Sequence, residues 1–328
     1  MNIQPYNEGD HDIWDFFVKD AVNGTFLHTR RYLSYHGARF RDRSLILVEA
    51  SRVVAVFPAA EDPRDPTGII SHPGITYGGL VHQGTLCGET LIEALGLCIA
   101  YYRDLGYRWL RYKVVPSIYH QRLLADDSYA LFRAGGHLWR RDLCAVIDHH
   151  AQRRLHRNRR QGVDRARRHG VSVSFDPIHF DAFWNILEEQ LEFRYRVRPV
   201  HSRSEMTTLM ERFPDHIHLA TALYENTVVA GLILYQTSVA TRAQYSAAGD
   251  VARRISALDL VFETAIMDSA QTGRRYFDFG NSNESDGRVL NEGLYRYKMG
   301  FGAGSVVQDF WEISLDNSEV PVNSAGHA

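Results

Sequence analysis

The sequence predicts an α/β (α+β) fold of two fused, similar domains, each a mixed and mostly antiparallel sheet flanked by helices. Three observations support this: a length of 328 residues, apolar strands alternating with amphipathic helices, and a repeat of that pattern in the second half of the chain. A chain of this length exceeds one ordinary hydrophobic core. A repeat this long indicates duplicated domains rather than a solenoid, and mixed sheets covered by helices follow from the order of the elements.

The repeat contains an antiparallel hairpin in each half. Residues 45–57 read LILVEASRVVAVF and residues 220–233 read ATALYENTVVAGLI, so both hold two apolar strands around a polar turn. Small residues follow at 77–79 (Tyr-Gly-Gly) and 245–247 (Tyr-Ser-Ala), and each stretch is expected to close a strand before a helix. Hairpins and helices are common enough to align by chance singly, but their shared order favours duplication.

A helix and then a strand are predicted after these stretches in both halves. Apolar residues keep helical spacing from 91 to a glycine at 106, and from 258 to a glycine at 273. Strands should follow at once, at 107–112 and 274–279. The first helix of each half is predicted at residues 13–21 and 180–194.

The domain boundary is predicted near residue 150. A strand at 143–147 ends there, and a polar, basic run begins. The predicted domains are therefore 1–150, which we expect to shape an acceptor site, and 151–315, which we expect to bind a donor and carry the catalytic groups. Residues 316–328 are small and polar, which predicts a disordered tail.

Composition and charge exclude several classes of protein. The formal net charge is −2, which gives no global attraction to DNA or to a membrane. The N-terminus lacks the pattern of a signal peptide, and no run of eighteen apolar residues occurs, so we expect a cytoplasmic protein without a membrane span. The three cysteines form no CxxC pair, and the sixteen histidines lack metal-ligand spacing, so no metal site is expected.

Residues 153–168 hold eight arginines against one acid, Asp164. A solvated helix face is one interpretation, although like charges four residues apart destabilise a helix. The other is a polyanion contact in which guanidinium groups, Arg157 and Arg160 among them, bind phosphates of CoA, of a nucleotide-linked substrate or of tRNA. The charge pattern alone leaves both open.

A second basic feature lies at 253–259. Ser256 precedes an apolar helix and Asp259 follows three residues later, as in a capping box. The free amides of that first helical turn, together with Arg253 and Arg254, could hold a pyrophosphate. Capping alone explains Ser256 equally well.

Polar residues gather after the strand that ends at Phe279. Asn281, Ser282 and Glu284 lie where open α/β sheets place ligands, just past the carboxyl end of a strand. Asp278 and Glu284 are candidate bases, but Asp278 is equally compatible with a structural acid beside Arg274 or Arg275.

The segment 294–302, LYRYKMGFG, brings a hydroxyl and a cation together at Tyr297 and Lys298. A lysine at a reacting carbonyl can neutralise developing negative charge. The plainer interpretation of this glycine-containing segment is a β-turn with a surface lysine.

The segment at 297–302 resembles the motif that closes the second domain of Fem-type and related tandem-GNAT acyltransferases, phenylalanine-lysine-x-glycine-phenylalanine-glycine. Here it reads YKMGFG, with tyrosine in place of the first phenylalanine. Other similar stretches are RRHGV at 167–171, YFDFG at 276–280 and YGGL at 77–80. The resemblance covers residues 10–315.

The resemblance implies an N-acyltransferase of the GNAT superfamily with no tightly bound cofactor. One branch of the family uses acyl-CoA as cosubstrate and acylates amino sugars, often nucleotide-linked, for surface polysaccharides such as O-antigen. The other uses aminoacyl-tRNA to extend peptidoglycan precursors. The sequence lacks the heptad-patterned helical arm of some tRNA-using members, which favours the first branch. The partners expected are a small-molecule amine acceptor, a nucleotide-linked sugar, with tRNA as the alternative and the oligomeric state open.

By this resemblance the amine attacks the acyl carbonyl directly, without a covalent enzyme intermediate. Glu284 or Asp278 would serve as base, and Lys298 with Tyr297 would stabilise charge. The phosphates would contact Arg253, Arg254, Ser256, Arg157 and Arg160. Residues expected to border the substrate are His72, Tyr77, Gly78, Tyr245, Asn281 and Ser282. The alternative from another class is a non-catalytic module that binds nucleotide-linked glycans or RNA.

Overall fold

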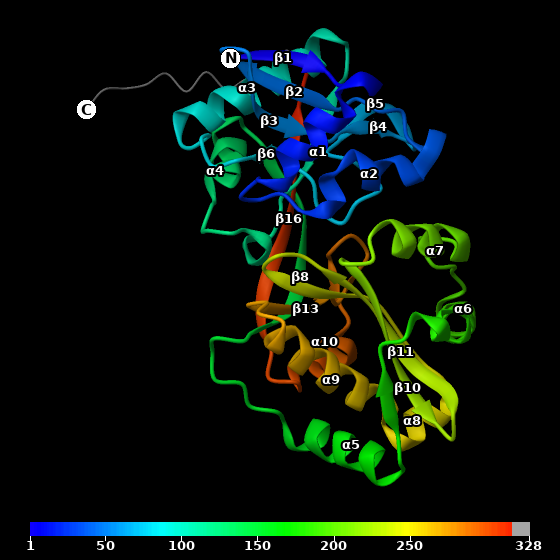
Figure 1. The fold of residues 1–328 in the computed structure, drawn as a ribbon. Helices are drawn as coiled ribbons and strands as arrows, with labels where there is room; N and C mark the ends of the chain where they lie inside the picture. The colour runs from blue at the N-terminus through cyan, green and yellow to red at the C-terminus, as the bar shows by residue number, and fades with distance from the viewer. Residues whose placement is uncertain (317–328) are drawn as a thin grey trace. The chain divides into compact units, whose positions relative to one another are not determined.

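The computed structural model describes residues 1–316, with the side chains of all of them except 194 and 195. The chain divides into two compact units (Figure 1). Unit 1 comprises Met1–Arg141 together with the described residues from Gln308 on, and unit 2 is Asp142–Val307. Each unit has its own buried core.

Unit 1 holds a four-stranded antiparallel set in the order β1-β2-β3-β6 and a second set in the order β4-β5-β7-β16. Strand β5 runs parallel to β7, and β7 pairs antiparallel with β16. The strands are β1 (Asn2–Pro5), β2 (Leu45–Glu49), β3 (Arg52–Phe57), β4 (Ala60–Asp62), β5 (Asp65–Ile70), β6 (Val81–His82), β7 (Trp109–Lys113) and β16 (Gly304–Ser314).

The core of unit 1 is built by the long helix α3 (Glu89–Asp104). Its buried stripe includes Leu91, Leu95 and Cys98, which join Leu45 and Leu110 of the sheets in one apolar cluster. Burying such side chains is the main favourable term in folding. The other helices of the unit are α1 (His11–Lys19), α2 (Arg30–Leu33) and α4 (Asp126–Arg133).

Unit 2 is one mixed sheet in the order β8-β13-β12-β11-β10-β9. Neighbouring strands in this order are antiparallel except for β12 and β13, which run parallel. The strands are β8 (His137–Asp148), β9 (Ser172–Ser174), β10 (Ile217–Tyr224), β11 (Thr227–Gln236), β12 (Ala240–Ala248) and β13 (Tyr276–Asn281), with a small hairpin of β14 (Asn283–Glu284) and β15 (Val289–Leu290).

Helices cover both faces of the unit 2 sheet. Successive residues of a strand point to opposite faces. On β11, Leu232 joins the core cluster that contains Phe262 of α9, whereas Gly231 lies against Phe183 of α6. Helices α6 and α9 therefore pack on opposite faces (Figure 1). The helices are α5 (Arg157–Arg168), α6 (Phe180–Tyr195), α7 (Arg203–Arg212), α8 (Asp250–Ile255), α9 (Ala257–Gln271) and α10 (Glu292–Met299).

The fold class predicted from the sequence is confirmed, because both halves contain the hairpin, the helix and the following strand in the expected order. The prediction that residues 77–79 close a strand is wrong. They lie in a loop between β5 and β6, which is held by hydrogen bonds from Gly78 N to Lys113 O and from Lys113 N to Ser71 Oγ. The matching residues 245–247 do lie in a strand, β12.

The predicted domain limits of 150 and 315 differ from those of the compact units. Residues 310–314 of β16 pair with β7 and thus belong to unit 1, although they follow unit 2 in the sequence. A return of the last strand to the first unit leaves no local signal in the sequence. The tail predicted at 316–328 falls outside the described residues except for Asp316.

Candidate active site

A cavity of about 610 Å³ opens in unit 2 where the parallel strands β12 and β13 part. The two strands pair over residues 240–242 and 276–278. Beyond this point, β12 contributes Ala243, Gln244, Ser246 and Ala248 to the cavity wall, and β13 contributes residues 279–281. A β-bulge at Gln244, between residues paired with Leu234 and Ile233, lies in the same stretch of β12. Bulges commonly re-aim side chains beside active sites.

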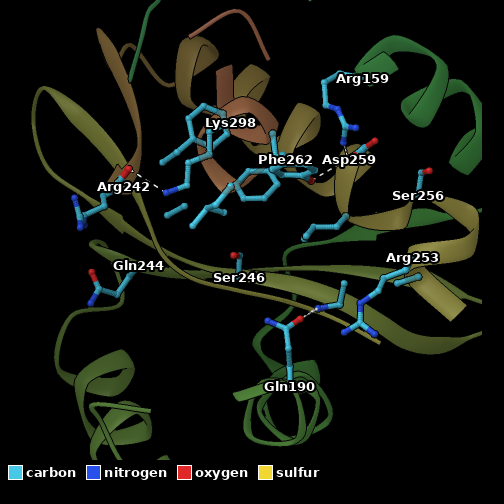
Figure 2. A pocket seen from close by; sticks show the side chains of 18 of the residues that line it. Arg159, Gln190, Arg242, Gln244, Ser246, Arg253, Ser256, Asp259, Phe262 and Lys298 are labelled. Atoms are coloured by element: carbon cyan, nitrogen blue, oxygen red, sulfur yellow. Dashed lines mark hydrogen bonds and ion pairs between the residues drawn. The ribbon is translucent and has the colours of Figure 1, made fainter. Parts of the chain in front are cut away.

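The cavity reaches both faces of the sheet. Gln190 and Leu191 line it from α6, while Asp259 and Phe262 line it from α9 on the opposite face. Figure 2 shows Gln190 on one side of the strand that carries Ser246, with Phe262 and Asp259 on the other. Side chains from both faces meet in one space only where the sheet is open. The separation of β12 from β13 therefore creates the site.

Asp259 is the buried acid of the cavity. Its Oδ1 accepts a hydrogen bond from Arg159 at 2.6 Å and another from the Tyr297 hydroxyl at 2.8 Å. Burial raises the pKa of this carboxyl, and the Arg159 guanidinium and the Tyr297 hydroxyl act in the opposite direction. Burial also raises the pKa of Tyr297 well above its usual value. The three side chains join α5, α9 and α10 around one carboxylate.

The predicted capping box at Ser256 is wrong. Ser256 stands between α8 and α9 with a left-handed φ of 61°, and its side chain makes no capping hydrogen bond to α9. The carboxylate of Asp259 is instead engaged by Arg159 and Tyr297. Ser256 does line the cavity, next to Arg253.

Helix α5 contains the basic run from Arg157 on, while Arg153 and Arg154 precede it, and acids of α9 explain how the run is stable. Asp259 and Glu263 lie one helical turn apart on α9. Arg159 pairs with Asp259, and Arg153 pairs with Glu263 through two hydrogen bonds of 2.5 and 2.9 Å. The other arginines of the run are exposed, which is compatible both with a solvated helix face and with a polyanion contact. They are Arg154, Arg157, Arg160, Arg165, Arg167 and Arg168.

Lys298 lies on helix α10, so the interpretation of its segment as a turn with a surface lysine is wrong. The side chain lines the cavity and is only 7% exposed. Its ammonium donates to the carbonyl oxygens of Gly280 at 3.1 Å and Asn281 at 2.5 Å. Burial lowers the pKa of Lys298 to about 8. This lysine is thus a cation held in a low-dielectric pocket by neutral carbonyls.

Neither acid predicted as a base lines the cavity. Asp278 is buried, accepts the Gly280 N–H at 2.7 Å and forms an ion pair with Arg242. It is a structural acid, although its partner is Arg242 rather than Arg274 or Arg275. Glu284 is exposed, and its Oε1 accepts a hydrogen bond from Asn291 at 2.8 Å.

The residues predicted to bind phosphates separate into two groups. Arg253 and Ser256 line the cavity. Arg254, Arg157 and Arg160 are exposed and are not part of its lining. Arg253 also pairs with the exposed Asp250 of its own helix.

The residues predicted to border the substrate are spread over both units. Asn281 lines the cavity, Ser282 is buried beside it in sequence, and the Tyr245 hydroxyl lies 2.7 Å from Nδ1 of His201. In unit 1, His72 and Tyr77 are buried and Gly78 sits tightly against Ser71. These three belong to the loop that is held by the Lys113 ammonium, which donates to the carbonyls of His72 and Ile75.

Several lining residues were missed by the sequence analysis. Arg242, Gln244, Ser246 and Ala248 recur at every second position of β12, and the bulge at Gln244 changes the face on which they lie. That alternation, just before a helix, was a usable signal. Gln190, Arg159 and Asp259 reach the cavity only through tertiary packing and left no comparable pattern.

Among residues 1–316, no three His, Cys, Asp or Glu side chains gather where they could hold a metal ion. None of the helices in this described part is long and apolar enough to cross a bilayer.

Residues 150–299 match the family described as the acetyltransferase (GNAT) domain. The crystal structure of FemX is similar over 96% of this chain and 97% of its own, at 12% identity and a TM-score of 0.66. The C-terminal domain of a putative lysylphosphatidylglycerol synthetase from Agrobacterium fabrum is similar over 84% of each chain, at 15% identity and a TM-score of 0.59. A tandem GNAT protein from the clavulanic acid biosynthesis pathway is similar over 97% of this chain and 99% of its own, at 12% identity and a TM-score of 0.51. No curated protein matches the sequence.

At these identities the solved structures show the fold, and the family match covers nearly all of unit 2. The chain has a tandem-GNAT fold whose residues 150–299 form a GNAT acetyltransferase domain. The family match identifies residues 150–299 as a GNAT acetyltransferase domain, so the chain contains the kind of acyltransferase domain that the sequence resemblance implied.

Proposed function

We propose that the protein is a cytoplasmic, acyl-CoA-dependent N-acyltransferase that acylates the amine of a nucleotide-linked amino sugar for surface polysaccharide biosynthesis. The observation that carries the donor assignment is the parting of β12 from β13 beside the cavity. A strand edge presents backbone N–H and C=O groups to any extended chain laid along it. The pantetheine arm of CoA is such a chain and carries two amides.

The charge along the cavity supports the same donor. Arg253 and Ser256 line it at the junction of α8 and α9, where the amides of the first turn of α9 favour an anion. Phe262 and Leu258 supply an apolar wall between this junction and Lys298. A pyrophosphate at the arginine and an acyl thioester near the lysine would use both ends of the cavity.

The acceptor part of the proposal is supported by the sequence resemblance and by the helix lengths of unit 2. The longest described helix of the unit, α6, has sixteen residues, which is about 24 Å. The long helical arm found in some tRNA-using relatives is therefore not among the described elements of unit 2. This favours the branch that acts on amino sugars.

Aminoacyl-tRNA is the second candidate donor, acting with a peptidoglycan precursor as acceptor, and a specific observation favours it. The exposed arginines of α5, which include Arg157 and Arg160, extend the basic surface beyond the cavity. One CoA molecule offers few phosphates for the five exposed arginines of α5, whereas an RNA backbone offers one per nucleotide. The likeness to FemX in fold agrees with this candidate.

Equilibrium binding at fixed ionic strength separates the two donors. We expect CoA and acetyl-CoA to bind saturably and uncharged and charged tRNA to bind only weakly. Replacing Arg253 with alanine should raise the CoA dissociation constant about tenfold, because a charge-assisted hydrogen bond contributes about 1.5 kcal/mol. The neighbouring Arg254→Ala is the matched control, since Arg254 lies outside the cavity lining, and it should leave CoA binding unchanged.

The opposite pattern would favour tRNA. In that case charged tRNA would bind tightly, and an Arg157→Ala/Arg160→Ala variant would bind it more weakly, with a salt dependence reduced by about one to two phosphate contacts. This result would make aminoacyl-tRNA the donor instead of acyl-CoA. The acceptor is tested by thiol release from acetyl-CoA with UDP-linked and dTDP-linked amino sugars and with the free sugars. Faster thiol release with free amino acids or peptides than with any amino sugar would reject the proposed amino-sugar acceptor.

A further inference from the structure

We propose that Lys298 is the general base that takes a proton from the attacking ammonium. The inference rests on the proposed function, because it presumes that the acyl donor occupies this cavity. It differs from the charge-stabilising role that the sequence resemblance implies for the same residue, and it replaces the two carboxylates predicted as bases. Three features of the cavity support it.

The first feature is the set of ionisable side chains in the described cavity wall. Arginine stays protonated in proteins, so the three lining arginines cannot serve as a base. The Tyr297 hydroxyl already donates to Asp259. The lining residues that can ionise are Arg159, Arg242, Arg253, Asp259, Tyr297 and Lys298.

Asp259 is already engaged by side chains of α5 and α10. Its Oδ1 accepts hydrogen bonds from both Arg159 and Tyr297. Its Oδ2 lies close to Gly162 of α5, because a Cβ atom added to that glycine would lie 1.9 Å from the oxygen. The carboxylate therefore holds α5, α9 and α10 together. Lys298 is the other lining group that can accept a proton.

The second feature is the geometry of the lysine. An uncharged amine has two N–H bonds and one lone pair. The carbonyl oxygens of Gly280 and Asn281 accept two hydrogen bonds from Nζ. Both carbonyls belong to β13, so deprotonated Lys298 keeps both of its anchors while the lone pair is left for a third direction. The residue lines the cavity, which is the space an acceptor amine would enter.

The third feature is the electrostatic surroundings of Nζ. The charged or ionisable groups that act on it electrostatically are Asp278 of β13, Arg242 of β12 and Cys144 of β8. Burial is the largest effect and lowers the pKa to about 8, Arg242 acts in the same direction, and Asp278 and Cys144 oppose it. A lysine with this pKa is partly uncharged near neutral pH, which suits a general base.

The reaction has two steps, a proton transfer and an acyl transfer. Uncharged Lys298 removes a proton from the ammonium of the acceptor and becomes an ammonium itself. The freed amine attacks the thioester carbon, the C–N bond forms, the C–S bond breaks, and CoA leaves as a thiolate. The second proton lost by the nitrogen protonates the thiolate, and Lys298 releases its proton to solvent. Proton transfer of this kind contributes roughly 100-fold or more to the rate.

Two small nucleophiles test the role of Lys298 at pH 7 with acetyl-CoA as donor. Ethanolamine is almost wholly an ammonium at this pH and needs a base, whereas hydroxylamine is almost wholly uncharged and does not. The variants are Lys298→Met, which removes the amine, and Lys298→Arg, which keeps a cation for the two carbonyls but cannot accept a proton. Circular dichroism and CoA affinity report whether each variant folds and binds donor.

We expect both variants to lose roughly 100-fold more of the ethanolamine rate than of the hydroxylamine rate. Equal losses with both nucleophiles would overturn the inference, because a group that stabilises the oxyanion or the local fold acts on either attack. Such a result would leave the acyltransferase assignment intact. A wild-type protein that accelerates neither reaction would overturn the acyl-CoA proposal and this inference together.

Discussion

A pair of helical glycines gives the sharpest test of how α5 is held against α9 within unit 2. Gly162 lies inside α5, and Gly96 lies inside α3 of unit 1. A Cβ atom at Gly162 would lie 1.9 Å from Oδ2 and 3.0 Å from Cγ of Asp259, whereas one at Gly96 would meet no atom within 4 Å. The same change to alanine is therefore expected to have opposite signs at the two sites.

The magnitudes follow from the contacts. Glycine to alanine inside a helix stabilises by about 1 kcal/mol when there is space, so Gly96→Ala should raise the free energy of unfolding by about that amount. At Gly162 the new methyl group must push the carboxylate away from Arg159 and Tyr297. Overpacking costs about 1 to 3 kcal/mol, and a weakened hydrogen bond to a charged group about 2 more. The net loss for Gly162→Ala is then about 3 kcal/mol.

Urea unfolding of the two variants measures these free energies. Repeating Gly162→Ala in an Asp259→Ala background removes the clash, and there the methyl group should no longer destabilise. Stabilisation by Gly162→Ala in the wild-type background, equal to that by Gly96→Ala, would refute the close contact between α5 and Asp259 on which the site depends.

Two further predictions concern buried charges. Asp278→Ala leaves the Arg242 guanidinium, whose side chain is 13% exposed, without its carboxylate, so urea unfolding should show a loss of about 3 kcal/mol; an Asp278→Leu/Arg242→Met double variant should lose clearly less, and equal losses would contradict the ion pair. Burial lowers the pKa values of His28, His82 and His120 to about 4, whereas the unfolded value is about 6.5. Protons therefore bind the unfolded chain first, and stability present above pH 6.5 should fall by about 1.4 kcal/mol per histidine for each pH unit between 6 and 4.5. His82→Gln should reduce the slope of this pH dependence by about 1.4 kcal/mol per pH unit, and a wild-type protein equally stable at pH 7.5 and 5 would contradict the burial of these rings.

The duplicated fold could be predicted from the sequence because its signals are local. Apolar spacing and a closing glycine fix α3 and α9, and the strands that follow them are short and apolar. The observed ends of the helices differ from the predicted ends by only a few residues. Loop 77–79 was misassigned because the hydrogen bonds that shape it come from Lys113, more than thirty residues away.

The site was less predictable because its parts pair over long sequence distances. Arg159 and Asp259 are 100 residues apart, so the capping pattern at Ser256 could not reveal the stronger partner of Asp259. The acids that stabilise the basic run, Asp259 and Glu263, are similarly far from it in the sequence and so could not be predicted as its partners. Lys298 and Asn281 were found because strand ends and a motif mark them, whereas Arg242 required knowledge of where β12 leaves β13.

The proposed donor site is the opening between β12 and β13. Ser246 is exposed and lies on the cavity wall in the middle of the separated part of β12, so Ser246→Trp should fill the opening with little effect on folding. Calorimetric titration with CoA tests this directly. We expect saturable binding to the wild type and no measurable binding to a folded Ser246→Trp variant, and equal CoA affinity in the two proteins would contradict this donor site.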